Sequence, residues 1–131
     1  MILLDTHVLV WLVTQDGRLS RPAASAIRRA RSSDGIAVAD ISLWEIALLL
    51  ATGILRAHGT VENVVNEFVT NSGALVQPIT PEIAALATQF PDSYPRDPAD
   101  RLIGATARAN GLALVTRDER MHASPLLKTI W

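Results

Sequence analysis

The sequence predicts a single α/β domain of 131 residues whose strands lie mostly parallel in one central sheet. Five short apolar segments have the length and composition of strands, and segments with helical patterns and caps separate most of them. A helix that joins two strands in this way crosses the sheet in a right-handed sense and leaves the strands parallel. The chain has no internal repeat and no linker, so we expect residues 1–131 to form one domain.

In the first half of the chain we expect two strands and three helices. In chain order these are a strand over 2–4, a helix over 7–13, a helix over 22–31, a strand over 36–39 and a helix from Ser42 to about residue 51. Both strand segments are continuously apolar, as is usual for strands that are covered on both faces. Thr6 is the expected cap of the first helix, and Ser20 followed by Pro22 opens the second. Ser42 has Glu45 three residues later, which is the spacing of a capping box.

The second half continues the same alternation. In chain order we expect a helix over 61–70, a strand at 75–76, a helix over 81–90, a helix over 98–110, a strand over 112–115 and a last strand within 127–130. Thr60 and Thr80 stand where helix caps are favoured, and Pro81 suits the first helical position. The Ala-rich helix after Pro98 should end at Gly111, because glycine readily takes the left-handed conformation that closes a helix.

The composition excludes several classes of protein. Cysteine is absent, which excludes disulfides and cysteine-based zinc sites. No apolar run is long enough to cross a membrane, and the first residues do not resemble a secretory signal, so we expect a cytoplasmic location. Hydrophobic residues make up 49% of the chain, a high fraction that suggests a surface covered by a protein partner or second subunit.

The charge does not announce a strong nucleic-acid binder, because the net charge is −1. Lys128 is the only lysine, however, so nearly all the basic charge comes from arginine, whose planar fork suits phosphate. The net charge would also become positive if a bound cation neutralised the acidic residues described next. Binding of RNA with modest affinity is therefore compatible with the composition.

Acidic residues occur at four places that a parallel sheet would bring to one edge. Asp5 and Asp118 each follow a predicted strand, whereas Glu45 and the pair Asp97 and Asp100 stand at the starts of predicted helices. In open parallel sheets, ligands bind beyond the carboxyl ends of the strands. We therefore expect these carboxylates to gather in one cluster at that edge.

Each of these residues also has an ordinary structural explanation. Asp5 can cap the first helix, Glu45 can belong to the capping box, and Asp118 can open a turn. Asp97 and Asp100 suit the N-cap and the first turn of a helix, where the helix dipole favours negative charge. Independent capping positions need not all fall at one edge of the sheet, however, and this coincidence favours a shared site.

Clustered carboxylates repel one another unless a cation neutralises them, and an oxygen-only ligand set suits Mg²⁺ or Mn²⁺ rather than zinc. Such ions activate water and stabilise a leaving oxygen in phosphodiester hydrolysis. Thr6 directly follows Asp5, and Thr116 stands two residues before Asp118, so both threonines can hold a carboxylate in orientation. Arg101 follows Asp100 and Arg117 precedes Asp118, and both can either bind phosphate or balance charge. Arg96 is a further candidate for RNA contact.

Other machinery for phosphate or acyl chemistry is absent. The chain has neither a glycine-rich phosphate-binding loop nor the nucleophile elbow of many hydrolases. Its three histidines are scattered without the spacing of paired ligands. His7 is expected on the first helix, near the acidic cluster, rather than as a metal ligand.

Four stretches of the chain together resemble the PIN-domain ribonucleases, and among these the VapC-type toxins of toxin–antitoxin pairs. They are Leu3-Leu4-Asp5-Thr6-His7, Ser42-Leu43-Trp44-Glu45-Ile46-Ala47, the run from Arg96 to Ala107, and Leu114-Val115-Thr116-Arg117-Asp118. Each stretch is short, but their order and spacing cover essentially the whole chain. The resemblance implies an αβα sandwich with a five-stranded parallel sheet, and a metal-dependent endoribonuclease that cleaves RNA to inhibit translation.

The resemblance also implies the ligands of the metal. The carboxylates that hold Mg²⁺ or Mn²⁺ in the family correspond to Asp5, Glu45, Asp100 and Asp118. Asp97 ranks lower, either as a contact to the metal through water or as a helix cap. Since none of the family's carboxylates is replaced, an inactive copy is not indicated.

The partners implied by the resemblance are an RNA substrate, a second copy of the chain and a cognate antitoxin. The surface expected to receive the antitoxin comprises Trp11, Trp44, Leu48 and Leu49. For most residues of this apolar surface the pattern favours ordinary core packing, since an amphipathic helix buries one face. In an alternative hypothesis, the chain is a PIN-like binding module with weak catalytic activity whose main role is to bind a protein partner. The intact set of carboxylates favours the enzyme.

Overall fold

The computed structural model describes residues 1–131 and has the αβα fold that the sequence predicts. Its central sheet has five strands, all parallel, in the order β3-β2-β1-β4-β5. The strands are β1 (Ile2–Leu4), β2 (Ile36–Ala39), β3 (Leu75–Gln77), β4 (Ala113–Val115) and β5 (Thr129–Ile130). In the central β1, Leu4 lies opposite Val38 of β2 and Val115 of β4, so the carboxyl ends of these three strands meet at one edge.

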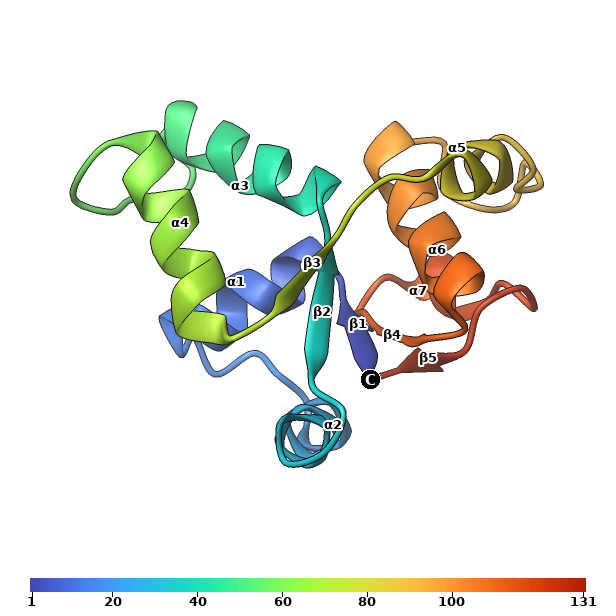
Figure 1. Ribbon diagram of the computed structural model, residues 1–131, viewed down its shortest axis with the longest axis horizontal. Coiled ribbons are helices and arrows are strands. Elements are labelled where there is room, and N and C mark those ends of the chain that lie inside the picture. Colours follow the sequence, from blue (N-terminus) through green and yellow to red (C-terminus); the bar gives the residue numbers. More distant parts are fainter.

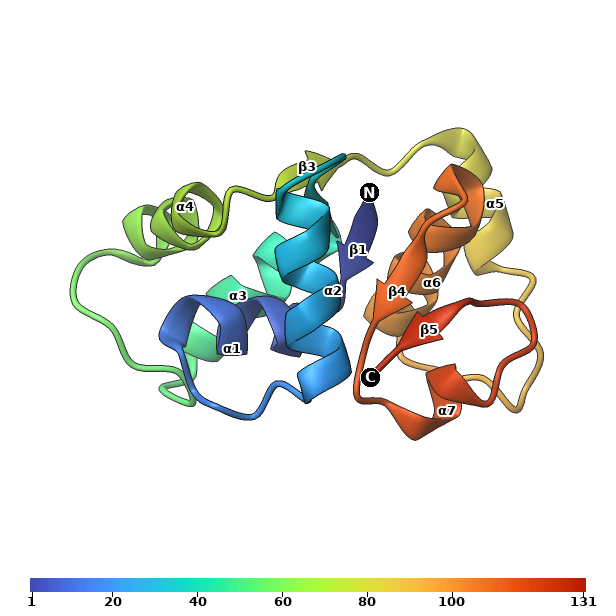
Figure 2. The same cartoon turned by 90° about the horizontal axis from the view of Figure 1, so that it is seen from below.

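Seven helices surround the sheet (Figures 1 and 2). They are α1 (Thr6–Thr14), α2 (Arg21–Arg31), α3 (Ile41–Ala51), α4 (Val61–Ser72), α5 (Pro81–Ala87), α6 (Pro98–Asn110) and α7 (Glu119–His122). The apolar faces of α1, α2 and α4 form one core with the sheet, and those of α5, α6 and α7 form a second core on its other face. The helix α3 packs against both α4 and α6. None of these helices, the longest of which has 13 residues, is long and apolar enough to cross a membrane.

The starts of two helices differ from those predicted. Asp5, and not Thr6, caps α1, because a side-chain oxygen of Asp5 accepts the backbone N–H of Thr6. The helix α3 begins at Ile41, so Ser42 lies inside the helix and the capping box predicted for Ser42 and Glu45 is wrong. Ser42 is fully buried and its hydroxyl lies 2.8 Å from that of Thr6, which means that this serine joins α3 to α1 instead of capping a helix end.

Two further differences concern the second half of the chain. The helix expected to reach residue 90 ends at Ala87, because Phe90 turns back into the core and stacks on Tyr94 with ring centroids 4.0 Å apart. The short helix α7, which begins at Glu119, was not predicted. The last two strands are also shorter than the apolar segments that predicted them.

Candidate metal centre

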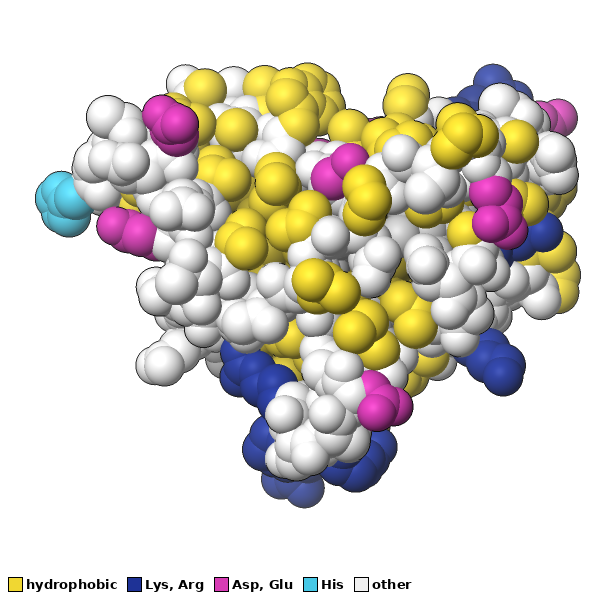
Figure 3. Space-filling model, viewed as in Figure 1, with side chains coloured by type: hydrophobic (Ala, Val, Ile, Leu, Met, Phe, Trp, Pro, Cys, Tyr) yellow, Lys and Arg dark blue, Asp and Glu magenta, His cyan; other side chains and the backbone are white.

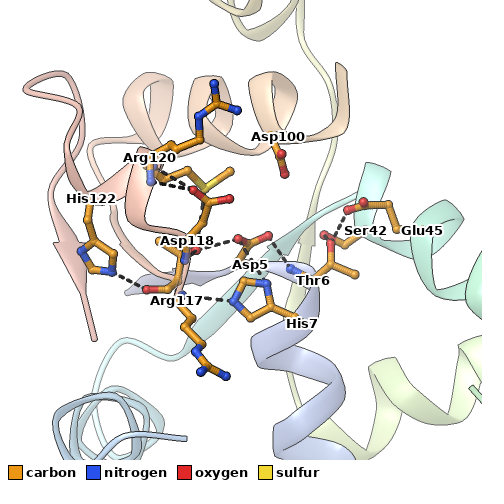
Figure 4. Close-up of polar contacts among 12 residues, drawn as sticks. Asp5, Thr6, His7, Ser42, Glu45, Asp100, Arg117, Asp118, Arg120 and His122 are labelled. Atoms are coloured by element: carbon orange, nitrogen blue, oxygen red, sulfur yellow. Dashed lines mark hydrogen bonds and ion pairs between the residues drawn. The ribbon is translucent and has the colours of Figure 1, made fainter. Parts of the chain in front are cut away.

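A cavity of about 540 Å³ lies at the carboxyl edge of the sheet, where α1, α3 and α6 begin. Four of the predicted acidic residues line it: Asp5, Glu45, Asp97 and Asp100. Figure 4 shows Asp5 in the middle, with Glu45 and Asp100 on one side and Asp118 on the other. The fold therefore brings the acidic residues to the one edge that the sequence indicates.

Asp5 follows the central strand and is 4% exposed. Its Oδ1 accepts the N–H of Thr6 at 2.8 Å, and its Oδ2 accepts the hydroxyl of Thr116 at 2.7 Å. The two explanations offered for this residue are therefore compatible, because one oxygen caps α1 while the carboxylate still lines the cavity. Two hydrogen bonds fix the orientation of the carboxylate before any ligand arrives.

Glu45 lies on the first turns of α3 and is held by Thr6 from α1. The Thr6 hydroxyl donates to Glu45 Oε1 at 2.5 Å, across the boundary between the two helices. Thr6 is itself buried, and its backbone N–H binds Asp5. One threonine thus orients two carboxylates of the cluster, which is the positioning role expected of it.

Asp97 and Asp100 belong to the start of α6. Oδ1 of Asp97 accepts the N–H of Ala99 at 2.8 Å, so Asp97 caps the helix while it lines the cavity. The side chain of Asp100 makes no hydrogen bond within the chain and is free to bind a ligand. The hydroxyl of the buried Tyr94 donates a hydrogen bond to the backbone carbonyl of Asp100 at 2.6 Å, and this contact fixes the first turn of α6.

Asp118 lies beside the same cluster but lines a neighbouring cavity of about 370 Å³. Its Oδ1 accepts the N–H groups of Arg120 and Met121, so that Asp118 caps α7. Its own N–H donates to the hydroxyl of Thr116, the same hydroxyl that donates to Asp5. Thr116 thereby links Asp118 to Asp5, and this link depends on the short helix that the sequence did not reveal.

No arginine or lysine forms an ion pair with any of these carboxylates; the only basic group that pairs with one of them is His7, whose Nδ1 lies 3.5 Å from Asp5 Oδ2. Burial, together with the negative charges of Asp5, Asp97, Glu45 and Asp118, raises the pKa of Asp100 to about 7. Burial also raises the pKa of Glu45, although the Thr6 hydroxyl stabilises its charged form. The cluster is thus an uncompensated concentration of negative charge.

This environment fits a hard divalent cation. All the candidate metal ligands are carboxylate oxygens, which Mg²⁺ and Mn²⁺ prefer, and a cation would offset the mutual repulsion of the carboxylates. In the present arrangement of side chains, no three acidic or histidine residues surround a common point at ligand distance. Small movements of the side chain of Asp100, which no hydrogen bond restrains, are the simplest way for ligands to converge on an ion.

The pKa of Asp100 predicts how the metal-free protein responds to pH. Between its ordinary value of 3.8 and its value of about 7 in the fold, the folded protein retains a proton that the unfolded chain releases. The contribution of this group to the free energy of unfolding therefore falls as the pH rises through that window. In melting experiments with EDTA, we expect Asp100→Asn, which cannot ionise, to melt above the wild type at pH 8 and to show a weaker loss of stability between pH 5 and pH 8. An unchanged pH slope in the variant would contradict this assignment.

Two contacts at the site had no local signal in the sequence. His7 Nε2 accepts the backbone N–H of Arg117 at 3.1 Å, so the imidazole proton resides on Nδ1, facing Asp5. Ser42 was expected only as a cap, yet it packs against Thr6 beneath Glu45. These pairs are separated by more than 30 residues in the chain, and only the register of the sheet and helices brings them together.

The three predicted RNA-contacting arginines differ in their surroundings. Arg101 donates from Nε to the carbonyl of Pro95 and from Nη1 to that of Phe90, so it braces the loop before α6. Arg96 and Arg117 are exposed. In Figure 4 the Arg117 guanidinium points away from the carboxylates. The bracing contacts leave Arg101 the least suited of the three to grip a phosphate.

An apolar wall completes the cavity on the side of α3. Trp44 is 58% exposed and Leu48 is 45% exposed, and both line the cavity together with the half-buried Leu49. Trp11, which was grouped with them, lines the neighbouring cavities on the side of α1 instead. Figure 3 shows hydrophobic side chains spread over α3 and α4 and toward α5, whereas the basic ones gather over α2.

Similarity to known proteins extends over the whole chain. The model of the family described as "PIN domain" matches residues 2–125. Ribonuclease VapC22 of Mycobacterium tuberculosis is 39% identical over 132 residues, which cover 99% of this chain and 98% of that protein. DNA-bound VapBC from Salmonella typhimurium has a TM-score of 0.69 at 19% identity, covering 98% of this chain and 97% of that one. A toxin–antitoxin complex from Klebsiella pneumoniae has a TM-score of 0.65 at 21% identity, covering 97% and 95%. With its fold, its acidic edge and these matches, the chain belongs to the PIN domain family.

Proposed function

We propose that this chain is a divalent-metal-dependent endoribonuclease, the toxin of a toxin–antitoxin pair, which hydrolyses RNA phosphodiester bonds and so inhibits translation. The observation that carries the proposal is the convergence of Asp5, Glu45, Asp97 and Asp100 on one cavity, with Asp118 beside it, and without a neutralising arginine or lysine. The similarity to a curated relative named as a ribonuclease supports RNA as the substrate.

The proposed metal ligands are Asp5, Glu45, Asp100 and Asp118. Asp97 ranks below them, because one of its oxygens already caps α6. When bound there, Mg²⁺ or Mn²⁺ would activate a water molecule and stabilise charge on the leaving oxygen. The chain's own contribution is orientation: Thr6 holds two of the carboxylates, and Thr116 holds Asp5 and the backbone of Asp118.

The RNA backbone would reach this cavity along exposed basic side chains. Arg96 precedes α6, and Arg117 lies between β4 and α7, so the two arginines flank the cluster in the chain and are free to bind phosphate. We assign Arg101 to bracing the loop, because two backbone carbonyls already occupy its guanidinium.

The proposed protein partners are a cognate antitoxin and a second copy of the chain. Trp44, Leu48 and Leu49 form an apolar wall directly beside Glu45, so an antitoxin bound there would cover the carboxylates as well as the wall. Several solved neighbours of this fold are complexes of toxin and antitoxin, which supports such a partner. A cytoplasmic location, where RNA and ribosomes are found, follows from this function.

Removal of metal tests the proposal directly. Purified protein with Mn²⁺ is expected to cleave RNA, and excess EDTA is expected to abolish cleavage, because nothing else in the cavity offsets the negative charge of an approaching phosphate. Mn²⁺ should also raise the melting temperature, since the ion binds the folded state preferentially. If Mn²⁺ neither shifts the melting temperature nor supports cleavage, the chain is a binding module instead.

A further inference from the structure

Trp11 forms an aromatic platform beside the candidate metal centre. The indole of Trp11, on α1, lines two cavities, one of which it shares with His7, Arg117 and Asp118. Asp118 belongs to the acidic cluster, so this cavity opens directly onto the site of the proposed reaction. His7 lines both this cavity and the one that contains the other carboxylates, so the indole lies next to the acidic cluster.

The platform is joined to the carboxylates through His7. The ring of His7 packs on that of Trp11 with centroids 4.9 Å apart, while its Nδ1 faces Asp5 Oδ2 at 3.5 Å. The other nitrogen of His7 accepts the N–H of Arg117. Trp11 is supported on a further side by Trp131, at 5.9 Å between ring centroids. The position of the indole is thus set relative to Asp5 before RNA arrives, which lowers the cost of ordering the site on binding.

Charge at the platform also suits a nucleotide. The guanidinium carbons of Arg18 and Arg117 lie 5.6 Å and 5.9 Å from the Trp11 ring. Arg18 is paired with Asp16 at 2.8 Å. The side chain of Arg117 forms neither an ion pair nor a hydrogen bond within the chain, so its donors are available for a phosphate. An indole beside an arginine whose donors are free offers both contacts that hold an unstacked nucleotide, namely stacking of the base and binding of its phosphate.

We propose that Trp11 and Arg117 form a subsite for the nucleotide adjoining the scissile phosphate, with the base stacked on Trp11 and its phosphate held by Arg117. This subsite rests on the proposed ribonuclease function and specifies its substrate as single-stranded or looped RNA. A base inside a duplex is already stacked on both faces and cannot stack on an indole. His7 acts as the positioning residue that connects the platform to Asp5.

The experiment compares RNA affinity among variants at position 11. Fluorescence anisotropy with a labelled single-stranded oligoribonucleotide, in Ca²⁺ to slow turnover, gives the dissociation constant; cleavage in Mn²⁺ gives KM and kcat. We expect Trp11→Ala to weaken binding and to raise KM by about ten-fold, the order that loss of one stacked base produces. Trp11→Phe, which keeps an aromatic face, should retain most of the affinity. Leu75→Ala, at a side chain 54% exposed on the edge strand β3, is the control and should leave both quantities unchanged.

A second measurement, made on the wild type, does not depend on how the variants fold. Two further RNAs each lack one base, on the 5′ or the 3′ side of the mapped cleavage site. One of the two should bind the wild type more weakly than the intact RNA does. Trp11→Ala should bind that RNA and the intact RNA equally well. Equal affinity of the wild type for the intact RNA and for both RNAs that lack a base would overturn the subsite. Equal affinity of Trp11→Ala and the wild type for intact RNA would overturn it too. This second conclusion holds even if Trp11→Ala loses affinity for a protein partner. An absence of cleavage by the wild type in Mn²⁺ would count against the proposed function and not against binding at Trp11.

Discussion

Replacement of Asp5 by Asn is expected to reduce RNA cleavage by at least 100-fold, on the order found when metal sites lose essential contacts. Asp5 lies at the centre of the acidic cluster and caps α1. One of its oxygens accepts the N–H of Thr6, and the other accepts the hydroxyl of Thr116. An amide carries no negative charge and presents only one oxygen to a cation. The variant should therefore bind Mn²⁺ more weakly, which calorimetric titration would measure alongside cleavage.

The same substitution is expected to leave the fold intact. Asn has the size of Asp, and its oxygen can still accept the N–H of Thr6 and cap α1. The amide nitrogen would face the Thr116 hydroxyl, which can accept a hydrogen bond from the amide instead of donating one. Removal of one charge from a crowded acidic cluster also lowers repulsion, so the circular dichroism spectrum should be unchanged and the melting temperature in EDTA should not fall substantially.

A matched change at Asp34 separates the site from a general effect of charge. Asp34 lies in the turn before β2, its side chain is 81% exposed, and its only contact is with the N-terminal amine. Asp34→Asn should cleave RNA at the wild-type rate. Cleavage by folded Asp5→Asn at the rate of Asp34→Asn would show that Asp5 does not take part in the reaction.

The candidate site could be predicted from the sequence because its residues lie at ends of secondary-structure elements. Asp5 and Asp118 follow apolar strands, and Asp97 and Asp100 open an evident helix, so the parallel topology alone brings them to one edge. The structure also explains why the sequence could not decide whether Asp5 caps a helix or belongs to the site. A carboxylate has two oxygens, and one oxygen of Asp5 caps α1 while the side chain still lines the cavity.

Other features of the site could not be predicted, because they depend on packing between distant segments. The spacing of Ser42 and Glu45 suggested a capping box, but α3 begins earlier and both side chains turn toward Thr6. Arg101 adjoins a carboxylate in sequence and yet points to the loop that precedes its helix. In each case the local pattern fits two arrangements, and only the fold selects between them.

The contact between α6 and Tyr94 leads to a strong expectation for Gly104. In an isolated helix, alanine is more stable than glycine by roughly 1 kcal/mol, so helix propensity alone predicts that Gly104→Ala stabilises the protein. In the fold, a methyl group at this position would overlap the hydroxyl of Tyr94 and lie 2.9 Å from the ring of Phe90. Tyr94 cannot easily move aside, because it is 1% exposed, stacks on Phe90 and donates to the carbonyl of Asp100.

We therefore expect Gly104→Ala to destabilise the protein by about 1–3 kcal/mol, the usual cost of overpacking, despite its better helix propensity. Thermal and urea unfolding would measure the loss. Cleavage should fall as well at temperatures where the variant is folded, because displacement of Tyr94 releases the turn that carries Asp100. A variant as stable as the wild type would show that the ring of Tyr94 does not pack closely against α6.

A double variant identifies the hydroxyl of Tyr94 as the main source of this conflict. Tyr94→Phe alone removes the hydrogen bond from the tyrosine hydroxyl to the carbonyl of Asp100 and should destabilise the fold, since a hydrogen bond of a buried side chain is lost. Combined with Gly104→Ala, however, the same change removes the atom that the new methyl group overlaps. The two changes should therefore cost less together than the sum of their separate costs, and the difference is the coupling energy between the two positions. Additive costs would mean that the methyl group is accommodated by movement of α6 as a whole, in which case the position of Asp100 would change even when the tyrosine is retained.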